Sequence, residues 1–138
     1  MKYITGIHAL NLTCELETPG DWHTSALKWE NISTKESDDS IWGNYGIECN
    51  RTIPFLSPTP KYNIANHIRA LLDLIEEGNF AVAQGMKKDY ICNDSYNEEI
   101  FDKVFMLRPF SIWEKINKFM EREYLMQWIN YIRRKENE

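Results

Sequence analysis

The sequence predicts an α+β fold in which a small antiparallel sheet from the N-terminal third packs against three to four C-terminal helices. Two observations support this class. Before Pro60 the chain has short apolar runs broken by Gly, Trp and turn residues, whereas after Pro60 it has nearly continuous helical patterns. The length of 138 residues is also close to the commonest size of one domain. We therefore expect a single domain over residues 1–138, with a strand and loop part at 1–58 and a helical part at 61–138.

The first third of the chain contains three predicted strands. The longest shows the period of two that is typical of a strand with one buried face. That face comprises alternate residues: Leu10, Leu12, Cys14 and Leu16. The same register, extended backwards, places His8 on the buried side. Shorter strands are predicted at 27–30 and at about 41–49, where two glycines weaken the pattern, and residues 31–40 are predicted as a solvated loop.

The clearest predicted helix covers about residues 63–77. Its apolar face follows the helical period through Ile64, Ile68, Leu71, Leu72 and Ile75. Arg69 and Asp73 are spaced to pair on the opposite face, and Gly78 is expected to end the helix. His67 lies at the edge of the apolar stripe, so we expect it to hydrogen-bond to backbone or water. A short helix or turn is expected at 80–86, and a further helix opens near residue 95 and ends at Pro109.

The last predicted helix, about residues 111–135, carries two apolar stripes that point in different directions. Ile112, Ile116 and Phe119 lie on the first stripe, whereas Tyr124, Trp128 and Tyr131 lie well over a quarter-turn round the helix. One straight helix cannot bury both stripes against a single core. Either the helix bends near Glu121–Glu123, or its second half presents Tyr124, Trp128 and Tyr131 to another chain.

Composition and charge narrow the possible functions. No apolar run approaches the roughly 18 residues of a membrane span, and the N-terminus lacks a secretory signal pattern, so we expect no membrane association and a cytoplasmic location. The net charge of −5 disfavours binding to nucleic acid. Three cysteines without a Cys-x-x-Cys pair favour reduced, partly buried thiols over disulfides or a thiolate zinc site.

The motifs that identify common enzyme classes are missing from this sequence. It has no phosphate-binding glycine loop, no His-Glu-x-x-His and no Gly-x-Ser-x-Gly. The most suggestive polar pair is Asp21 and His23, which point the same way if the segment is extended. They could act as a general acid and base with His8 in support, or join His8 and His67 at a metal; the simpler interpretation is a structural hydrogen bond after the Pro19-Gly20 turn. We expect no metal and no cofactor.

Five tryptophans are available as core residues or as anchors for a partner. Trp29 and Trp113 fall on predicted buried faces. Trp22 and Trp42 are harder to place inside, so they join Tyr124, Trp128 and Tyr131 as candidate partner-binding residues.

Several segments of the chain resemble one group of proteins. The segments are Tyr3 to Leu12, Gly20-Asp21-Trp22-His23, Trp29-Glu30, Tyr45-Gly46-Ile47-Glu48 and Ala83-Gln84-Gly85-Met86. Together they resemble small uncharacterised bacterial proteins encoded near abortive-infection or toxin–antitoxin genes. The resemblance implies a defence-system or mobile-element context and assigns no residue a role.

The sequence therefore favours a non-enzymatic function. We expect a small acidic interaction domain that binds and restrains a protein partner, as an antitoxin or an inhibitor of a defence nuclease does. The partner would be a heterologous protein or a second copy of the chain. The alternative is a small hydrolase or nucleotide-processing enzyme that uses Asp21 and His23 with His8.

Overall fold

The computed structural model describes all 138 residues and has the predicted α+β class. Its four short strands are β1 (Lys2–Ile4), β2 (Thr34–Glu36), β3 (Ile47–Arg51) and β4 (Tyr62–Ala65). They form one sheet in the order β2-β1-β4-β3. The outer pairs are antiparallel as predicted, but β1 and β4 run parallel, so the sheet is mixed.

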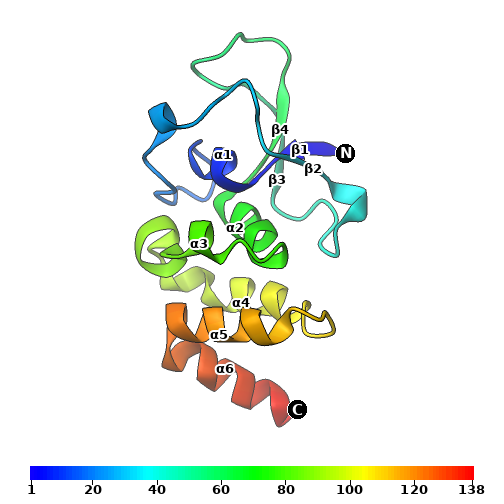
Figure 1. Cartoon of the computed structure of the whole chain (residues 1–138), viewed down its shortest axis with the longest axis vertical. Coiled ribbons are helices and arrows are strands. Elements are labelled where there is room, and N and C mark those ends of the chain that lie inside the picture. Colours follow the sequence, from blue (N-terminus) through cyan, green and yellow to red (C-terminus); the bar gives the residue numbers. More distant parts are fainter.

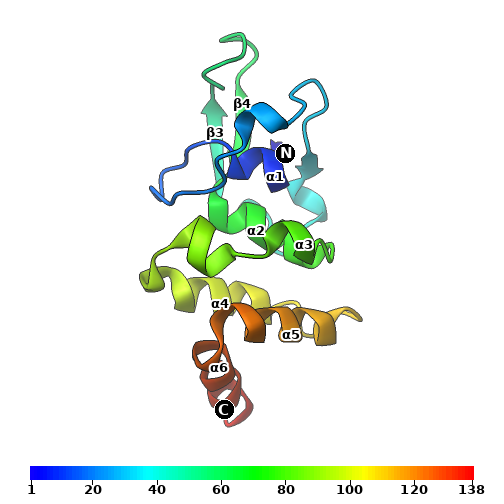
Figure 2. The same ribbon diagram turned by 60° about the vertical axis from the view of Figure 1, so that its left-hand side comes forward.

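The helices follow the sheet as successive layers. They are α1 (Gly6–Leu10), α2 (His67–Glu76), α3 (Phe80–Ala83), α4 (Asn97–Phe105), α5 (Trp113–Tyr124) and α6 (Met126–Glu136). Figure 1 shows the sheet and α1 at one end, α2 and α3 beneath them, then α4 and α5, and finally α6 with the C-terminus at the far end. The view turned by 60° shows the same order (Figure 2). No helix has the length and apolar character that crossing a membrane requires.

One hydrophobic core extends from Tyr3 in β1 to Tyr131 in α6. Helix α2 lies at its centre, because every residue from His67 to Ile75 is buried. The expected helix at 63–77 therefore begins later than predicted. Residues 62–65 form β4, and the Asn66 side chain caps α2 by accepting a hydrogen bond from the Arg69 amide at 2.8 Å. The expected stop is confirmed, since the chain turns at Gly78 with φ of +78°.

The predicted strand around Leu10–Leu16 is wrong, although its alternation of burial is real. Residues 6–10 form α1, and the following segment alternates between covered and exposed side chains from Leu12 to Thr18 without a partner strand. Side chains satisfy its backbone instead: Glu48 accepts from the Glu15 amide at 2.8 Å, and the Tyr96 hydroxyl donates to the Leu16 carbonyl at 3.2 Å. A period of two therefore indicated an extended segment, not a sheet ladder.

The other two predicted strands also differ from those in the structure. Residues 27–30 are not a strand, and the Trp29 indole instead packs edge-on against His8 with ring centroids 4.9 Å apart. The segment expected as a solvated loop contains β2, and β3 begins only at Ile47, because residues 41–46 form turns that use positive φ at Gly43 and Gly46.

The last predicted helix breaks in two, and the break falls at Leu125 rather than at 121–123. Leu125 has φ of 53° and ψ of −129°, and α6 starts immediately after it. The break turns the second aromatic stripe onto α4. Tyr124, Trp128 and Tyr131 pack round Phe101 with ring centroids 4.9, 5.2 and 5.4 Å away, and each is at most 2% exposed.

The prediction that Tyr124, Trp128 and Tyr131 bind a partner is therefore corrected. All three belong to the core of their own chain. Of the two alternatives, the structure therefore shows the bend and not the interface. Two of them also use their polar atoms internally, since the Trp128 indole donates to Asn117 at 2.8 Å and the Tyr131 hydroxyl donates to Asp102 at 2.6 Å.

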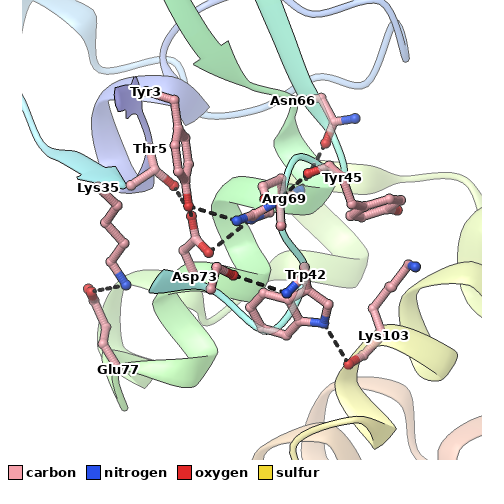
Figure 3. Close-up of polar contacts among 12 residues, drawn as sticks. Tyr3, Thr5, Lys35, Trp42, Tyr45, Asn66, Arg69, Asp73, Glu77 and Lys103 are labelled. Atoms are coloured by element: carbon pink, nitrogen blue, oxygen red, sulfur yellow. Dashed lines mark hydrogen bonds and ion pairs between the residues drawn. The ribbon is translucent and has the colours of Figure 1, made fainter. Parts of the chain in front are cut away.

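A buried ion pair on α2 connects the sheet to the helices (Figure 3). Arg69 and Asp73 pair as their spacing predicts, with 3.1 Å between Nε and Oδ1, but they are 0% and 1% exposed instead of lying on a solvated face. The other oxygen of Asp73 accepts hydrogen bonds from the hydroxyls of Tyr3 and Thr5, both at 2.6 Å.

The Arg69 guanidinium completes the network on its other side. It donates to the carbonyls of Gly43 at 2.8 Å and Tyr45 at 2.5 Å, and to the Tyr3 hydroxyl at 2.9 Å. Burial and the bond to Asp73 raise the pKa of Tyr3 well above its usual range. Trp42 lies over the guanidinium, is 6% exposed and donates its indole N–H to the Lys103 carbonyl at 3.0 Å. Because it is buried, Trp42 is not the partner-binding residue that the sequence predicted.

We expect the replacement Arg69→Met to destabilise the protein by about 3–5 kcal/mol, because it leaves the Asp73 carboxylate buried without its cation. Urea unfolding of the wild type and the variant measures the difference. Lys35→Met is the matched control, since Lys35 pairs with Glu77 at 3.1 Å near the surface and its loss should cost about 0–1 kcal/mol. Equal effects of the two replacements would contradict a structural role for the buried pair.

Candidate functional site

Two of the polar residues that the sequence singled out, Asp21 and His23, lie on one long irregular loop. We define loop 11–25 as the segment that follows α1 and ends within the short 3-10 turn η1 (Thr24–Ala26). Irregular loops of this length inside a compact domain are commonly functional. Loop 11–25 contains Asp21, Trp22 and His23, and it passes over the N-terminal end of α2.

The Asn11 side chain holds the two ends of the loop together. Its amide group donates to the Ile7 carbonyl at 2.9 Å and to the Asp21 carboxylate at 3.2 Å. Its oxygen accepts from the His23 amide at 2.9 Å. Because Asn11 is the residue that ends α1, the loop is closed directly onto that helix.

Backbone hydrogen bonds fix the middle of the loop. The Gly20 amide donates to the Tyr90 carbonyl at 3.0 Å, and the Asp21 amide donates to the Leu10 carbonyl at 2.7 Å. Gly20 has φ of +66°, and a Cβ there would lie 2.7 Å from Cε1 of His67, so only glycine fits between the loop and α2. The loop is irregular but firmly held.

Asp21 and His23 form the close pair that their spacing predicted. His23 Nδ1 lies 2.5 Å from Asp21 Oδ1. Because a carboxylate only accepts, Nδ1 carries a proton, and in the neutral ring Nε2 has the lone pair, which no hydrogen-bond partner occupies. Burial raises the pKa of Asp21, but hydrogen bonds from His23, the Trp22 amide and Asn11 outweigh it and hold the pKa below its usual range.

His8 does not belong to this pair. Both of its ring nitrogens are used elsewhere: Nε2 lies 3.0 Å from the Lys28 carbonyl, and Nδ1 lies 3.1 Å from the Ser33 amide. The prediction that His8 supports Asp21 and His23 in catalysis is therefore wrong. The three histidines do not converge on a metal either, because no three His, Cys, Asp or Glu side chains gather in a suitable arrangement.

Trp22 is the most exposed large apolar side chain of the chain, at 81%. It stands beside a shallow hollow of about 410 Å³, whose lining includes Asn11, Thr13, Thr18, Asp21 and Ser25. The backbone on both sides of Trp22 is fixed by the bonds of Asp21 and His23, so the indole projects from a rigid support.

A larger hollow than the one beside Trp22 lies outside this loop. It has a volume of about 630 Å³ and is lined by β1, residues 29–34 and residues 60–63. None of the candidate site residues predicted from the sequence lines it. The candidate site is therefore loop 11–25, where Asp21, Trp22 and His23 are brought together.

Sequence reasoning missed two features of this loop. Asn11 gave no signal, because its role depends on a turn that returns Asp21 and His23 to the end of α1. The second feature is a contact between the loop and α2, in which Thr18 Oγ1 lies 2.6 Å from His67 Nδ1 although the two residues are 49 positions apart. His67 also bonds to backbone as expected, at 2.6 Å from the Leu12 carbonyl, but it is fully buried.

Comparison with protein-family models, with characterised proteins and with solved structures finds no match to this chain. The function must therefore be argued from the geometry of the chain itself.

The lowered pKa of Asp21 gives a prediction for acid stability. Because the pKa is lower in the folded chain than in the unfolded chain, the ionised carboxylate stabilises the fold at pH values above about 4, and this contribution is lost as the pH falls through the folded-state pKa. The stability advantage of the wild type over Asp21→Asn should therefore be full near neutral pH and shrink in acid.

Denaturant unfolding of both proteins at several pH values measures this advantage. Asp39→Asn is the control, because Asp39 is exposed and makes no ion pair. A wild-type advantage that stays constant into acid would contradict the assignment.

Proposed function

We propose that the protein is a protein-binding module that holds a basic partner through loop 11–25. The observation that carries the proposal is the 81% exposure of Trp22 on a loop whose backbone is fixed from both sides. Leaving an indole in water forfeits the free energy of burying it. A rigidly presented tryptophan, in contrast, loses little conformational freedom on binding and is among the commonest anchors at interfaces.

The charge of loop 11–25 indicates the kind of partner. Residues 3–27 contain no Lys or Arg, whereas Glu15, Glu17 and Asp21 lie on the loop itself. Glu15 and Glu17 are exposed, and the whole chain carries a net charge of −5. Such a surface attracts a basic protein and repels nucleic acid.

The biological role that fits this surface is restraint of the partner. A nuclease or another enzyme of nucleic acids binds its substrate through a basic surface, and an acidic loop with an aromatic anchor is complementary to that surface. We therefore propose an inhibitor or antitoxin-like role, in keeping with the resemblance to proteins encoded near defence genes. Neither Trp42 nor the aromatic residues of α6 take part, because they are buried.

The test is co-purification of tagged protein from the host with a matched pair of variants. Trp22→Ala should lose a stoichiometric basic partner, since truncation of an anchor of this kind costs about 2 kcal/mol or more, roughly thirtyfold in Kd. Phe55→Ala is the control, because Phe55 is also exposed, at 49%, but lies outside the loop. It should retain the partner.

Both variants should melt close to the wild type, and added salt should weaken the complex. A partner that Trp22→Ala retains at wild-type strength would overturn the proposal.

A second candidate function follows from the Asp21–His23 pair. A carboxylate that orients an exposed imidazole with a free Nε2 has the arrangement of a general base. The chain would then be a small hydrolase that removes a proton from water or from a hydroxyl of its substrate, with the hollow beside Trp22 as the place for that substrate.

Hydrolysis of p-nitrophenyl acetate and of bis(p-nitrophenyl) phosphate tests this candidate. His23→Gln should abolish any activity and Asp21→Asn should reduce it, both measured at a temperature where each variant is still folded. Trp22→Ala should abolish partner binding without removing the general base. Activity that persists in His23→Gln would reject the hydrolase.

A further inference from the structure

A second group of reactive side chains lies where loop 11–25 meets α2. Cys14 Sγ is 3.6 Å from Thr18 Oγ1, and Thr18 Oγ1 is 2.6 Å from His67 Nδ1. On the other side of the ring, His67 Nε2 is 2.6 Å from the Leu12 carbonyl. A thiol, a hydroxyl and an imidazole therefore form one continuous line of hydrogen bonds.

The hydrogen bonds fix the direction of this line. Because a carbonyl only accepts, Nε2 of His67 must carry a proton, and the lone pair of the neutral ring is on Nδ1. The Thr18 hydroxyl then donates to Nδ1, and its oxygen accepts from the Cys14 thiol. The imidazole is 1% exposed and is held against Gly20, so it cannot turn away. The proton of Cys14 can pass through Thr18 to His67.

Cys14 is half-buried and is one of the residues that line a hollow. The hollow has a volume of about 290 Å³ and is also lined by Glu15, Glu48 and Arg51. Arg51 pairs with Glu48 at 2.9 Å, which leaves the Glu15 carboxylate without a cation. Cys14 therefore borders a space that is open to a small molecule and carries a net negative charge.

The other two cysteines have no such surroundings. Cys92 is exposed and donates its thiol proton to the Lys88 carbonyl at 2.9 Å. Cys49 is exposed and has the Met1 sulfur as its neighbour at 3.8 Å. Burial raises the pKa of Cys14, but His67 and Thr18 outweigh it and bring the pKa down to about 7. The thiolate in turn outweighs burial at His67 and raises the pKa of that ring.

We propose that Cys14 is a nucleophilic thiol that exchanges with small disulfides, and that those bearing amines are preferred. The thiolate attacks one sulfur of the reagent, so that a new disulfide forms to Cys14 while the S–S bond of the reagent breaks. The departing thiolate takes up the proton that His67 holds. Cys14 is thereby oxidised, and half of the reagent is reduced to a thiol. The preference for amines follows from the unpaired carboxylate of Glu15.

This proposal does not depend on the proposed partner binding, because none of its three groups is Trp22. The experiment uses the full chain with Cys49→Ser and Cys92→Ser, so that Cys14 is the single thiol, and mass spectrometry follows its reaction with cystamine from about pH 5.5 to about pH 9. The rate should rise with a midpoint near pH 7. A matched chain that keeps only Cys92 should react about three to four times more slowly at neutral pH.

Adding Thr18→Val to the single-thiol chain isolates the role of the hydroxyl, since valine keeps the shape and removes the relay. The midpoint should move up towards the ordinary value of about 8.5, and Thr18→Ser should restore it. A midpoint near 8.5 without any Thr18 replacement, or one that Thr18→Val leaves unchanged, would overturn the proposal. The rates of Cys14 with cystamine and with oxidised glutathione, which is anionic, are each divided by the rate of a free thiol with the same reagent at low salt. Equal values for the two reagents would overturn the preference for amines.

Discussion

The buried ion pair between Arg69 and Asp73 is the interaction on which the rest of the structure depends. Neither charge reaches water, so each must be satisfied by the protein, and the groups that do so come from β1, from Thr5 beside α1 and from the turn at 43–45. An unsatisfied charge at this depth would cost several kcal/mol. That cost fixes the first strand and the turn before β3 relative to α2.

The same helix then positions the candidate site. Asn66 caps α2, and the next residue, His67, accepts a hydrogen bond from the Thr18 hydroxyl and donates one to the Leu12 carbonyl of the neighbouring loop. Arg69 follows within the same turn and faces the sheet. One turn of helix therefore joins the core network to loop 11–25, which explains how a segment without regular structure presents Trp22 from a rigid support.

Local spacing in the sequence predicted contacts well but did not predict their surroundings. Arg69 and Asp73 pair as an i, i+4 spacing requires, yet that spacing does not say whether the face is solvated. The contact of Asp21 with His23 was also predictable, although a turn closed by Asn11 produces it.

The two apolar stripes of the last predicted helix could not distinguish a break in that helix from a surface that binds another chain. Both explanations require the same angle between the two stripes. The break at Leu125 depends on the packing of the aromatic residues against Phe101, a tertiary contact. Contacts between distant segments, such as that of Thr18 with His67, leave no pattern in one sequence.

Thr18 connects the two chemistries proposed for loop 11–25. Its hydroxyl lies between Cys14 and His67, and the same residue lines the hollow beside Trp22. A group attached to Cys14 removes the thiol proton from the relay, and Thr18 is the residue through which that change would reach the hollow beside Trp22. Where both proposals hold, the two events are thermodynamically linked: a partner seated on Trp22 changes the equilibrium for modifying Cys14 by the same factor as the modification changes the affinity for the partner.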